Sequence, residues 1–157
     1  MFYTRCYIPL IFKLIDKQCI MKSNELRIGN LLTSKTWQGV GEIQGIETFK
    51  DYFELKIKDY IHKIDDTTYC DVKPIKLTPK WLLKSGAKKN QLPNSYWISV
   101  ANLKAELHFE TFDNTDEIVT TLISQVCELI LDRIKYVHEY QNLYYALTKC
   151  ELFLSGI

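Results

Sequence analysis

The sequence predicts an α+β fold: a small curved antiparallel sheet or SH3-like barrel, a short middle helix, a second set of antiparallel strands, and a C-terminal amphipathic helix. Three observations favour this class. Short runs of alternating apolar and polar residues, separated by glycines, fill 24–77. A helical segment with clear start and stop signals follows at 78–86. The last stretch, 134–149, repeats apolar residues at steps of three and four.

The chain of 157 residues has the length of one domain, with 46% apolar residues and a net charge of +1. We expect a single α+β domain over 21–157, preceded by an N-terminal extension, 1–20, that lacks a signal-peptide cleavage site. The first regular pattern follows Met21 directly, which makes Met21 a candidate start. No run approaches the roughly 20 apolar residues of a membrane helix. We therefore expect a soluble protein without a membrane partner.

Four runs read as the strands of the first sheet. Tyr52, Glu54 and Lys56 alternate with Phe53 and Leu55, as one half-buried strand requires. Glycines and the Asp65-Asp66 pair supply turns between the runs. The runs are ELRIGNLLTS at 25–34, GVGEIQGIETF at 39–49, YFELKIKDYIHKI at 52–64 and YCDVKPIKL at 69–77.

The middle helix carries the clearest boundary signals in the chain. Thr78 can cap it, Pro79 suits its first position, and Gly86 marks its end. The segments 95–100 and 103–112 then return to strand character, and DNTD at 113–116 predicts a turn.

The segment 117–134 is ambiguous by periodicity. An apolar stripe at helical spacing competes with the β-branched run 118–121, which disfavours a helix and suits a strand. We expect a β-hairpin that turns near Ser124 and Gln125. The stripe consists of Ile118, Leu122, Val126, Leu129 and Ile130.

The C-terminal helix has two distinct sides. Its apolar side is expected to pack on a sheet; it carries Val137, Tyr140, Leu143, Tyr144 and Leu147. The other side is either a polar cap on the domain or a second contact surface; it carries His138, Gln141, Asn142 and Tyr145. The sequence leaves both interpretations open.

The sequence shows few features of a catalytic site or a metal-binding site. His138 lacks an orienting carboxylate, because its neighbour Glu139 does not face it on a helix. The three histidines lack metal-ligand spacing, and the five cysteines are scattered without a CxxC pair, as in a protein of a reducing cytosol. We therefore expect no enzymatic activity, no cofactor, no bound metal and no small-molecule substrate.

The basic side chains are segregated along the chain. Seven lysines and no acid lie between Val72 and Ala105. Lysines interleaved with aromatic residues suit a nucleic acid, or a protein surface that normally holds one. The alternative is a solvated lysine face with a buried tryptophan. The candidate binding residues are Lys76, Lys80, Trp81, Lys84, Lys88 and Lys89.

Three blocks resemble a family of small phage and prophage proteins. They are ELRIGN at 25–30, LTPKWLLKSGA at 77–87 and IKYVHEYQNLYYALT at 134–148. That family begins shortly after a methionine with ELRIGN and closes with Y-V-H-x-L-Q-N-L-Y-x-A-L-T-G. This chain departs from it at Ala87, where the family has phenylalanine, at Tyr140, where it has leucine, and at Lys149, where it has the final glycine.

The resemblance implies a phage or prophage accessory protein that acts inside the bacterial host cell. Some proteins of this kind are anti-CRISPR inhibitors, and this chain is similar in size and character to an inhibitor of the type VI-B effector, an RNA-guided RNase. We therefore expect it to bind and inhibit a host CRISPR nuclease, with or without its guide RNA. The alternative is a nucleic-acid-binding accessory module of phage metabolism.

Overall fold

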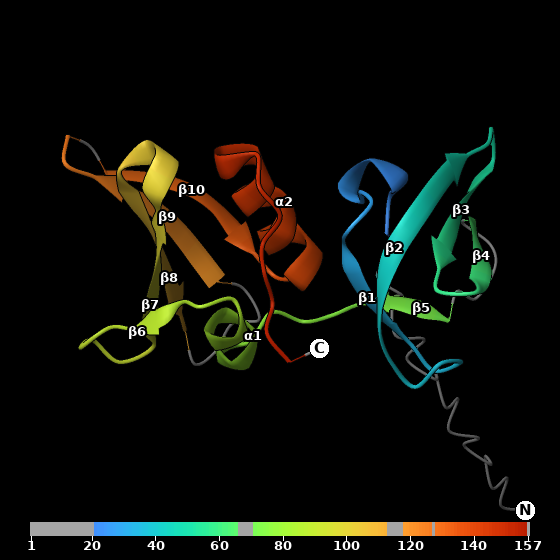
Figure 1. The fold of residues 1–157 in the computed structure, drawn as a ribbon, viewed down its shortest axis with the longest axis horizontal. Helices are drawn as coiled ribbons and strands as arrows, with labels where there is room; N and C mark the ends of the chain where they lie inside the picture. Colours follow the sequence, from blue (N-terminus) through green and yellow to red (C-terminus); the bar gives the residue numbers. More distant parts are fainter. Residues whose placement is uncertain (1–20, 66–70, 113–117, 127, 157) are drawn as a thin grey trace, which may run out of the picture.

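The computed structural model describes residues 21–65, 71–112, 118–126 and 128–156 (Figure 1). Two five-stranded antiparallel sheets form its two halves, with two helices in the second half. This arrangement confirms the predicted α+β class. The N-terminal extension 1–20 and the turn predicted at 113–116 lie outside the described residues, and the turn predicted at 65–66 does so in part.

The first sheet has the strand order β4-β3-β2-β1-β5 and is curled into a half-barrel (Figure 1). Its inward residues alternate with exposed ones, so that Phe53, Leu55 and Ile57 lie in the core. Its strands are β1 (Leu31–Ser34), β2 (Gly39–Thr48), β3 (Tyr52–Ile57), β4 (Tyr60–Asp65) and β5 (Val72–Pro74).

Two of the predicted runs differ from the structure. The strand predicted over 25–34 is wrong in its first part, because η1 (Ser23–Glu25) is a 3₁₀ helix and only β1 is extended. Gly29, at φ 91°, turns the chain between them, and the Asn30 side chain accepts a hydrogen bond from the Arg27 N–H at 2.9 Å. The run 52–64 is a hairpin that turns at Lys58, at φ 55°, without the usual glycine or asparagine.

The second sheet has the order β10-β9-β8-β7-β6. The predicted hairpin over 118–134 is confirmed, with one register shift between Ile130 and Asp132. The predicted middle helix is also confirmed, although the Thr78 side chain makes no capping hydrogen bond. The elements are α1 (Pro79–Lys84), β6 (Lys88–Lys89), β7 (Ser95–Val100), η2 (Ala101–Leu103), β8 (Ala105–Thr111), β9 (Ile118–Ser124) and β10 (Glu128–Ile134).

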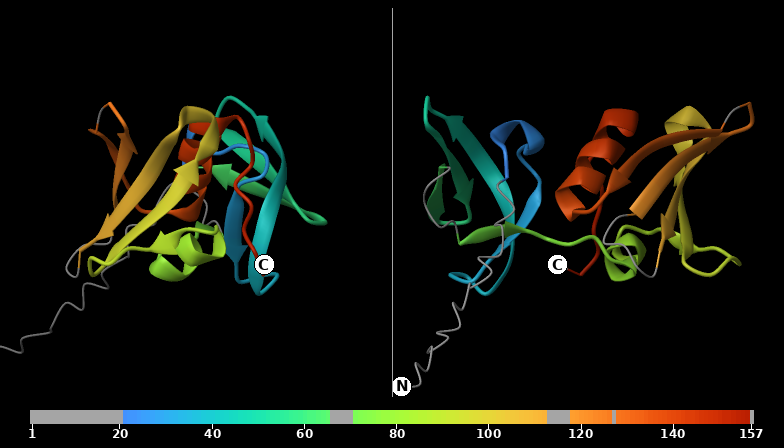
Figure 2. Two further views of the ribbon diagram at one scale, coloured as in Figure 1. Left: turned by 60° about the vertical axis from the view of Figure 1, so that its left-hand side comes forward. Right: turned by 180° about the vertical axis from the view of Figure 1, so that it is seen from behind.

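The C-terminal helix α2 (Val137–Thr148) lies between the two sheets, as the view from behind in Figure 2 shows. It begins where the Glu139 carboxylate accepts hydrogen bonds from the backbone N–H groups of Lys135 and Tyr136. Tyr140 is fully buried against Phe109 of β8, with the ring centroids 5.0 Å apart. The helix therefore has neighbours on two sides.

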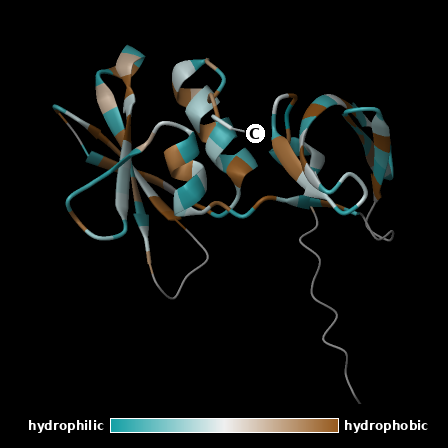
Figure 3. Cartoon of the chain, turned by 60° about the horizontal axis from the view of Figure 1, so that its bottom comes forward, coloured by the Kyte–Doolittle hydropathy of each residue, from teal (hydrophilic) through white to brown (hydrophobic). Residues whose placement is uncertain are grey.

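The two hydrophobic cores meet at β1. Leu31 belongs to the cluster formed with α1, α2 and the second sheet, whereas Leu32 belongs to the cluster inside the first sheet. Successive side chains of a strand point to opposite faces, which explains this division. Figure 3 shows hydrophobic and hydrophilic residues alternating along the strands. Among the described residues, no helix has the length and apolar character to cross a membrane.

Candidate functional site

The predicted lysines gather at one end of the second sheet. Lys80 and Lys84 lie on α1, Lys88 and Lys89 form β6, and α1 contacts β6. Lys76 lies on the preceding segment, where it forms an isolated bridge with Tyr136. The side chains of all these lysines except Lys84 are exposed.

Two of the predicted binding residues, Lys84 and Trp81, make contacts within the protein and are not free for a partner. The Lys84 ammonium donates a hydrogen bond to the Gly156 carbonyl at 2.7 Å and lies 5.0 Å from the Trp81 ring centroid. Trp81 is partly buried against the core. The Lys84 carbonyl also accepts hydrogen bonds from both the backbone and the hydroxyl of Ser155. Lys84 and Trp81 therefore hold the C-terminal segment against α1.

Lys80, Lys88 and Lys89, which we call the basic edge, remain exposed, and Lys88 lies beside a second tryptophan. The Lys88 ammonium lies 5.1 Å from the centroid of the Trp97 ring on the neighbouring strand. Trp97 is half-buried, so part of its ring is open to solvent. The sequence placed Trp97 in the basic segment but did not identify it as a site residue.

Trp97 belongs to a row of side chains across the face of the second sheet opposite α2. Cross-strand partners share one face, and Trp97 is opposite His108, which is opposite Thr121. His108 is hydrogen-bonded through Nε2 to the Glu106 carboxylate at 2.9 Å. This pairing was not predicted, because a sequence does not show which strands are neighbours.

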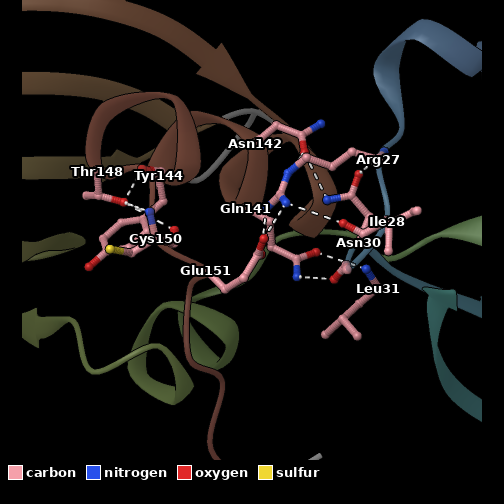
Figure 4. A network of polar contacts seen from close by, with 11 residues as sticks. Arg27, Ile28, Asn30, Leu31, Gln141, Asn142, Tyr144, Thr148, Cys150 and Glu151 are labelled. Atoms are coloured by element: carbon pink, nitrogen blue, oxygen red, sulfur yellow. Dashed lines mark hydrogen bonds and ion pairs between the residues drawn. The ribbon is translucent and has the colours of Figure 1, made fainter.

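The other predicted surface, on α2, is the junction between the two halves (Figure 4). Gln141 is buried and its amide group bridges to β1. Its Oε1 accepts a hydrogen bond from the Leu31 N–H at 2.9 Å, and its Nε2 donates to the Gly29 carbonyl at 3.0 Å. An open contact surface that includes Gln141 is therefore ruled out in this structure.

Asn142 and Tyr145 contact Arg27 from the first half. The Arg27 guanidinium donates through Nε to Asn142 Oδ1 at 3.0 Å and lies 4.2 Å from the Tyr145 ring centroid. It also donates two hydrogen bonds to the Glu151 carboxylate, at 2.6 and 2.7 Å. These contacts lower the pKa of Glu151. The blocks 25–30 and 134–148, which carry the resemblance, thus meet in space.

His138 is 2% exposed and its ring stacks on Tyr136 at 5.7 Å between centroids. Burial lowers the pKa of His138, and the nearby carboxylates of Glu139 and Glu25 oppose that shift. Among the described residues, the ring nitrogen Nδ1 has no hydrogen-bond partner. Of the two interpretations that the sequence leaves open for this side of α2, a solvent-exposed contact surface does not fit His138, because the ring lies in the interior.

No family model, curated protein or solved structure matches this chain. The resemblance to small phage proteins stays a prediction.

A Ser-His-Asp set in the first half does not form a catalytic triad. Ser34 donates its hydroxyl hydrogen bond to the Asp71 carboxylate directly, and Thr36 donates to the same oxygen. Hydrogen bonds from Ser34 and Thr36 hold the pKa of Asp71 far below its usual range. His62 Nε2 is buried and has no hydrogen-bond partner in the described part of the chain, so it does not act on Ser34. Asp71 ties the β1–β2 loop to β5.

An open groove of about 640 Å³ lies beside the junction. Residues of β1 and β2 line one wall, and the C-terminal segment 151–154 lines the other. Within the described parts of the chain, no group of three or more histidine, cysteine or acidic residues is placed to hold a metal ion. Cys150 is exposed with a free thiol, and the other four cysteines lie outside the described residues.

Proposed function

We propose that the protein is a non-catalytic phage or prophage accessory protein that binds and inhibits a host defence nuclease in the bacterial cytoplasm. Its leading target is the RNA-guided RNase of type VI-B CRISPR systems, alone or with its guide RNA. The observation that carries the proposal is the basic edge, where Lys80, Lys88 and Lys89 are exposed and the Lys88 ammonium lies 5.1 Å from the centroid of the Trp97 ring. The resemblance of the three sequence blocks supports the choice of target.

The chemistry of the basic edge fits a surface that an RNA-guided nuclease presents. Three ammonium groups attract phosphate oxygens or acidic side chains, and they raise the rate of encounter at low salt. Lysine contacts phosphates as a point charge, whereas arginine pairs with guanine edges, so the contact would be independent of base sequence. The exposed part of the Trp97 ring supplies apolar area next to these charges.

We also propose that the protein has no catalytic activity. The most suggestive histidine of the sequence, His138, is buried, and its neighbour Glu139 is engaged by two backbone N–H groups at the start of α2. His108 faces the solvent side of the second sheet, but its Nε2 is paired to Glu106. These pairings favour a binding role for the protein over a reaction.

A pulldown of the purified effector, with and without guide RNA, tests the proposal. We expect a complex and loss of target-RNA cleavage. In the triple variant Lys80→Glu, Lys88→Glu and Lys89→Glu, both effects should weaken, and the residual binding should depend less on salt. The matched control reverses Lys22, Lys50 and Lys56, which are equally exposed on the first half. Absence of a complex under all conditions would reject the proposal.

A second candidate function is a nucleic-acid-binding accessory module without a protein target. The contact between the Lys88 ammonium and the Trp97 ring favours it, because base stacking next to a cation is how single strands are held. It predicts binding of bare single-stranded RNA or DNA that falls steeply with salt. If the fluorescence anisotropy of the single-stranded RNA or DNA does not change at micromolar protein, this candidate function is rejected.

A further inference from the structure

The short helix α1 has an exposed side that mixes charge with apolar surface. Lys80 and Leu83 are three residues apart, so they are neighbours on the surface of the helix. Leu83 is 52% exposed, whereas the adjacent Leu82 is fully buried in the core. A helix that only covers a core carries polar residues on its outer side. The exposed leucine therefore has no role in packing α1 on the core.

Two further side chains extend this surface beyond α1. Lys89 is opposite Tyr96 in the β6–β7 pair, and Tyr96 is buried in the same core cluster as Leu82 of α1. Cross-strand partners share one face of a sheet, so Lys89 lies on the face where α1 packs. α1 contacts β6, and both lie at the same end of the second half (Figure 1). The loop that follows Lys89 adds a second apolar side chain, Leu92, which is 62% exposed.

The charge around these side chains is of one sign. The segment 72–105, which contains α1, β6 and the loop, has seven lysines and no acidic residue. Neither Lys80 nor Lys89 takes part in the ion pairs found among the described residues. Their ammonium groups are therefore open to a partner of opposite charge.

The two leucines distinguish between the classes of partner that lysines attract. A nucleic acid offers phosphates to lysines and base rings to aromatic side chains, and a leucine side chain makes neither contact. The aromatic residue of α1, Trp81, is partly buried against the core, and the Lys84 ammonium lies over its ring. An acidic protein segment with apolar side chains, in contrast, pairs with the lysines and covers the leucines.

We propose that Lys80, Leu83, Lys89 and Leu92, which we call the α1 surface, bind a segment of a partner protein that carries acidic and apolar side chains. The inference rests on the proposed function and deepens it, because it assigns the contact to the protein part of the nuclease and not to its guide RNA. Burial of the leucines supplies affinity, and the lysines steer the encounter. Binding then persists without guide RNA and keeps a component that salt does not weaken.

Binding of the full chain to the purified type VI-B effector without guide RNA tests the inference. Biolayer interferometry should detect a complex, and Leu83→Ser and Leu92→Ser should each weaken it about tenfold. The matched control is Leu129→Ser on β10, where the leucine is 54% exposed, and it should bind as the wild type does. All three variants should keep the wild-type circular dichroism spectrum. A complex that forms only with guide RNA, or that both leucine variants leave unchanged, would overturn the inference.

A second set of probes separates this inference from the proposed function. If the effector forms no complex under any condition, the proposed function fails, and two labelled helical peptides then decide the inference. One peptide consists of glutamate and leucine, and the other has serine in place of each leucine. Tighter binding of the leucine peptide, lost in Leu83→Ser, would support the inference, whereas equal binding of both peptides would reject it.

Single-stranded poly(U) RNA is the probe for the other class of partner. The α1 surface should bind it weakly and only at low salt, because the lysines alone contact phosphates. Tight binding of poly(U) that is lost in Lys80→Glu and Lys89→Glu, but is unchanged in Leu83→Ser, would show a nucleic-acid site at α1 and would refute the inference.

Discussion

Gln141 of α2 accepts a hydrogen bond from the backbone N–H of Leu31 at 2.9 Å, although 110 residues separate them in the chain. The same amide group donates to the Gly29 carbonyl at 3.0 Å. A single buried side chain thus satisfies a donor and an acceptor at the start of β1, in the way a neighbouring strand would. This bridge joins the half built on the first sheet to the half built on the second.

We predict that Gln141→Leu destabilises the protein by about 2–4 kcal/mol. The change removes two hydrogen bonds and leaves the buried Leu31 N–H and the part-buried Gly29 carbonyl without these partners. Urea denaturation followed by circular dichroism measures the loss. The control Gln91→Leu changes an exposed glutamine in the β6–β7 loop and should shift stability by less than about 0.5 kcal/mol. Equal effects of the two would contradict the bridge.

Arg27→Lys should cost about 1–2 kcal/mol, because lysine keeps the charge but loses the two-pronged contact with Glu151 and the hydrogen bond to Asn142. Glu151→Gln should cost less than about 1 kcal/mol, since that carboxylate is more than half exposed. Denaturation at low and high salt measures both. A larger loss in Glu151→Gln than in Arg27→Lys would show that charge dominates over geometry.

We predict from the burial of His138 that the free energy of unfolding falls as the pH drops below about 6.5. Burial holds the folded-state pKa of His138 below its usual 6.5, so the unfolded chain binds a proton before the folded chain does as the pH falls. The contribution of neutral His138 to stability is therefore fully present above pH 6.5 and is lost as the pH falls below it. Burial also lowers the pKa of His62. In His138→Gln, the pH slope of the unfolding free energy should therefore be reduced but not abolished. His108→Gln serves as the control, and an unchanged slope in His138→Gln would refute the prediction.

Gly41→Ala should destabilise the first half by about 1–3 kcal/mol. A Cβ at Gly41 would lie 2.5 Å from Cγ2 of Ile57 and 3.3 Å from the Trp37 ring, so the core must shift. Gly39→Ala, two residues earlier on the same strand, has nothing within 4 Å and should be close to neutral. Thermal unfolding of the pair checks the prediction, and similar melting temperatures would contradict it.

Lys149→Gly should stabilise the protein by about 0.5–1 kcal/mol. Lys149 ends α2 in the left-handed region, at φ 58°, where glycine is not strained. Lys149→Ala keeps that strain and should bring no gain. Chemical denaturation of the two variants separates relief of backbone strain from the simple loss of the lysine side chain.

Local signals were sufficient for most of the fold. The boundary signals at Thr78, Pro79 and Gly86 predicted α1, because proline fixes φ at the helix start and glycine allows the positive φ at which the helix ends. The β-branched run 118–121 predicted the β9–β10 hairpin against a competing helical stripe. The hairpin at Lys58 was missed, since its turn uses a lysine at positive φ and carries no local signal.

The site was predictable only in part. Lysines that are close in the sequence stay close on α1 and β6, so the basic edge follows from the sequence. Lys84 and Trp81 looked equivalent to the others, but contacts with the distant Gly156 and with the core give them structural roles. The spacing of residues in the sequence does not predict these contacts of Lys84 and Trp81.

The sequence by itself determined α1, the β9–β10 hairpin and the two unlike sides of α2, because these depend on backbone propensities and the spacing of apolar residues. Only the tertiary structure decided that His138 and Gln141, on the polar side of α2, lie in the interior and that Gln141 is hydrogen-bonded to β1. The physical reason is that the fate of a polar side chain depends on what packs over it, and the groups over Gln141 lie 110 residues away.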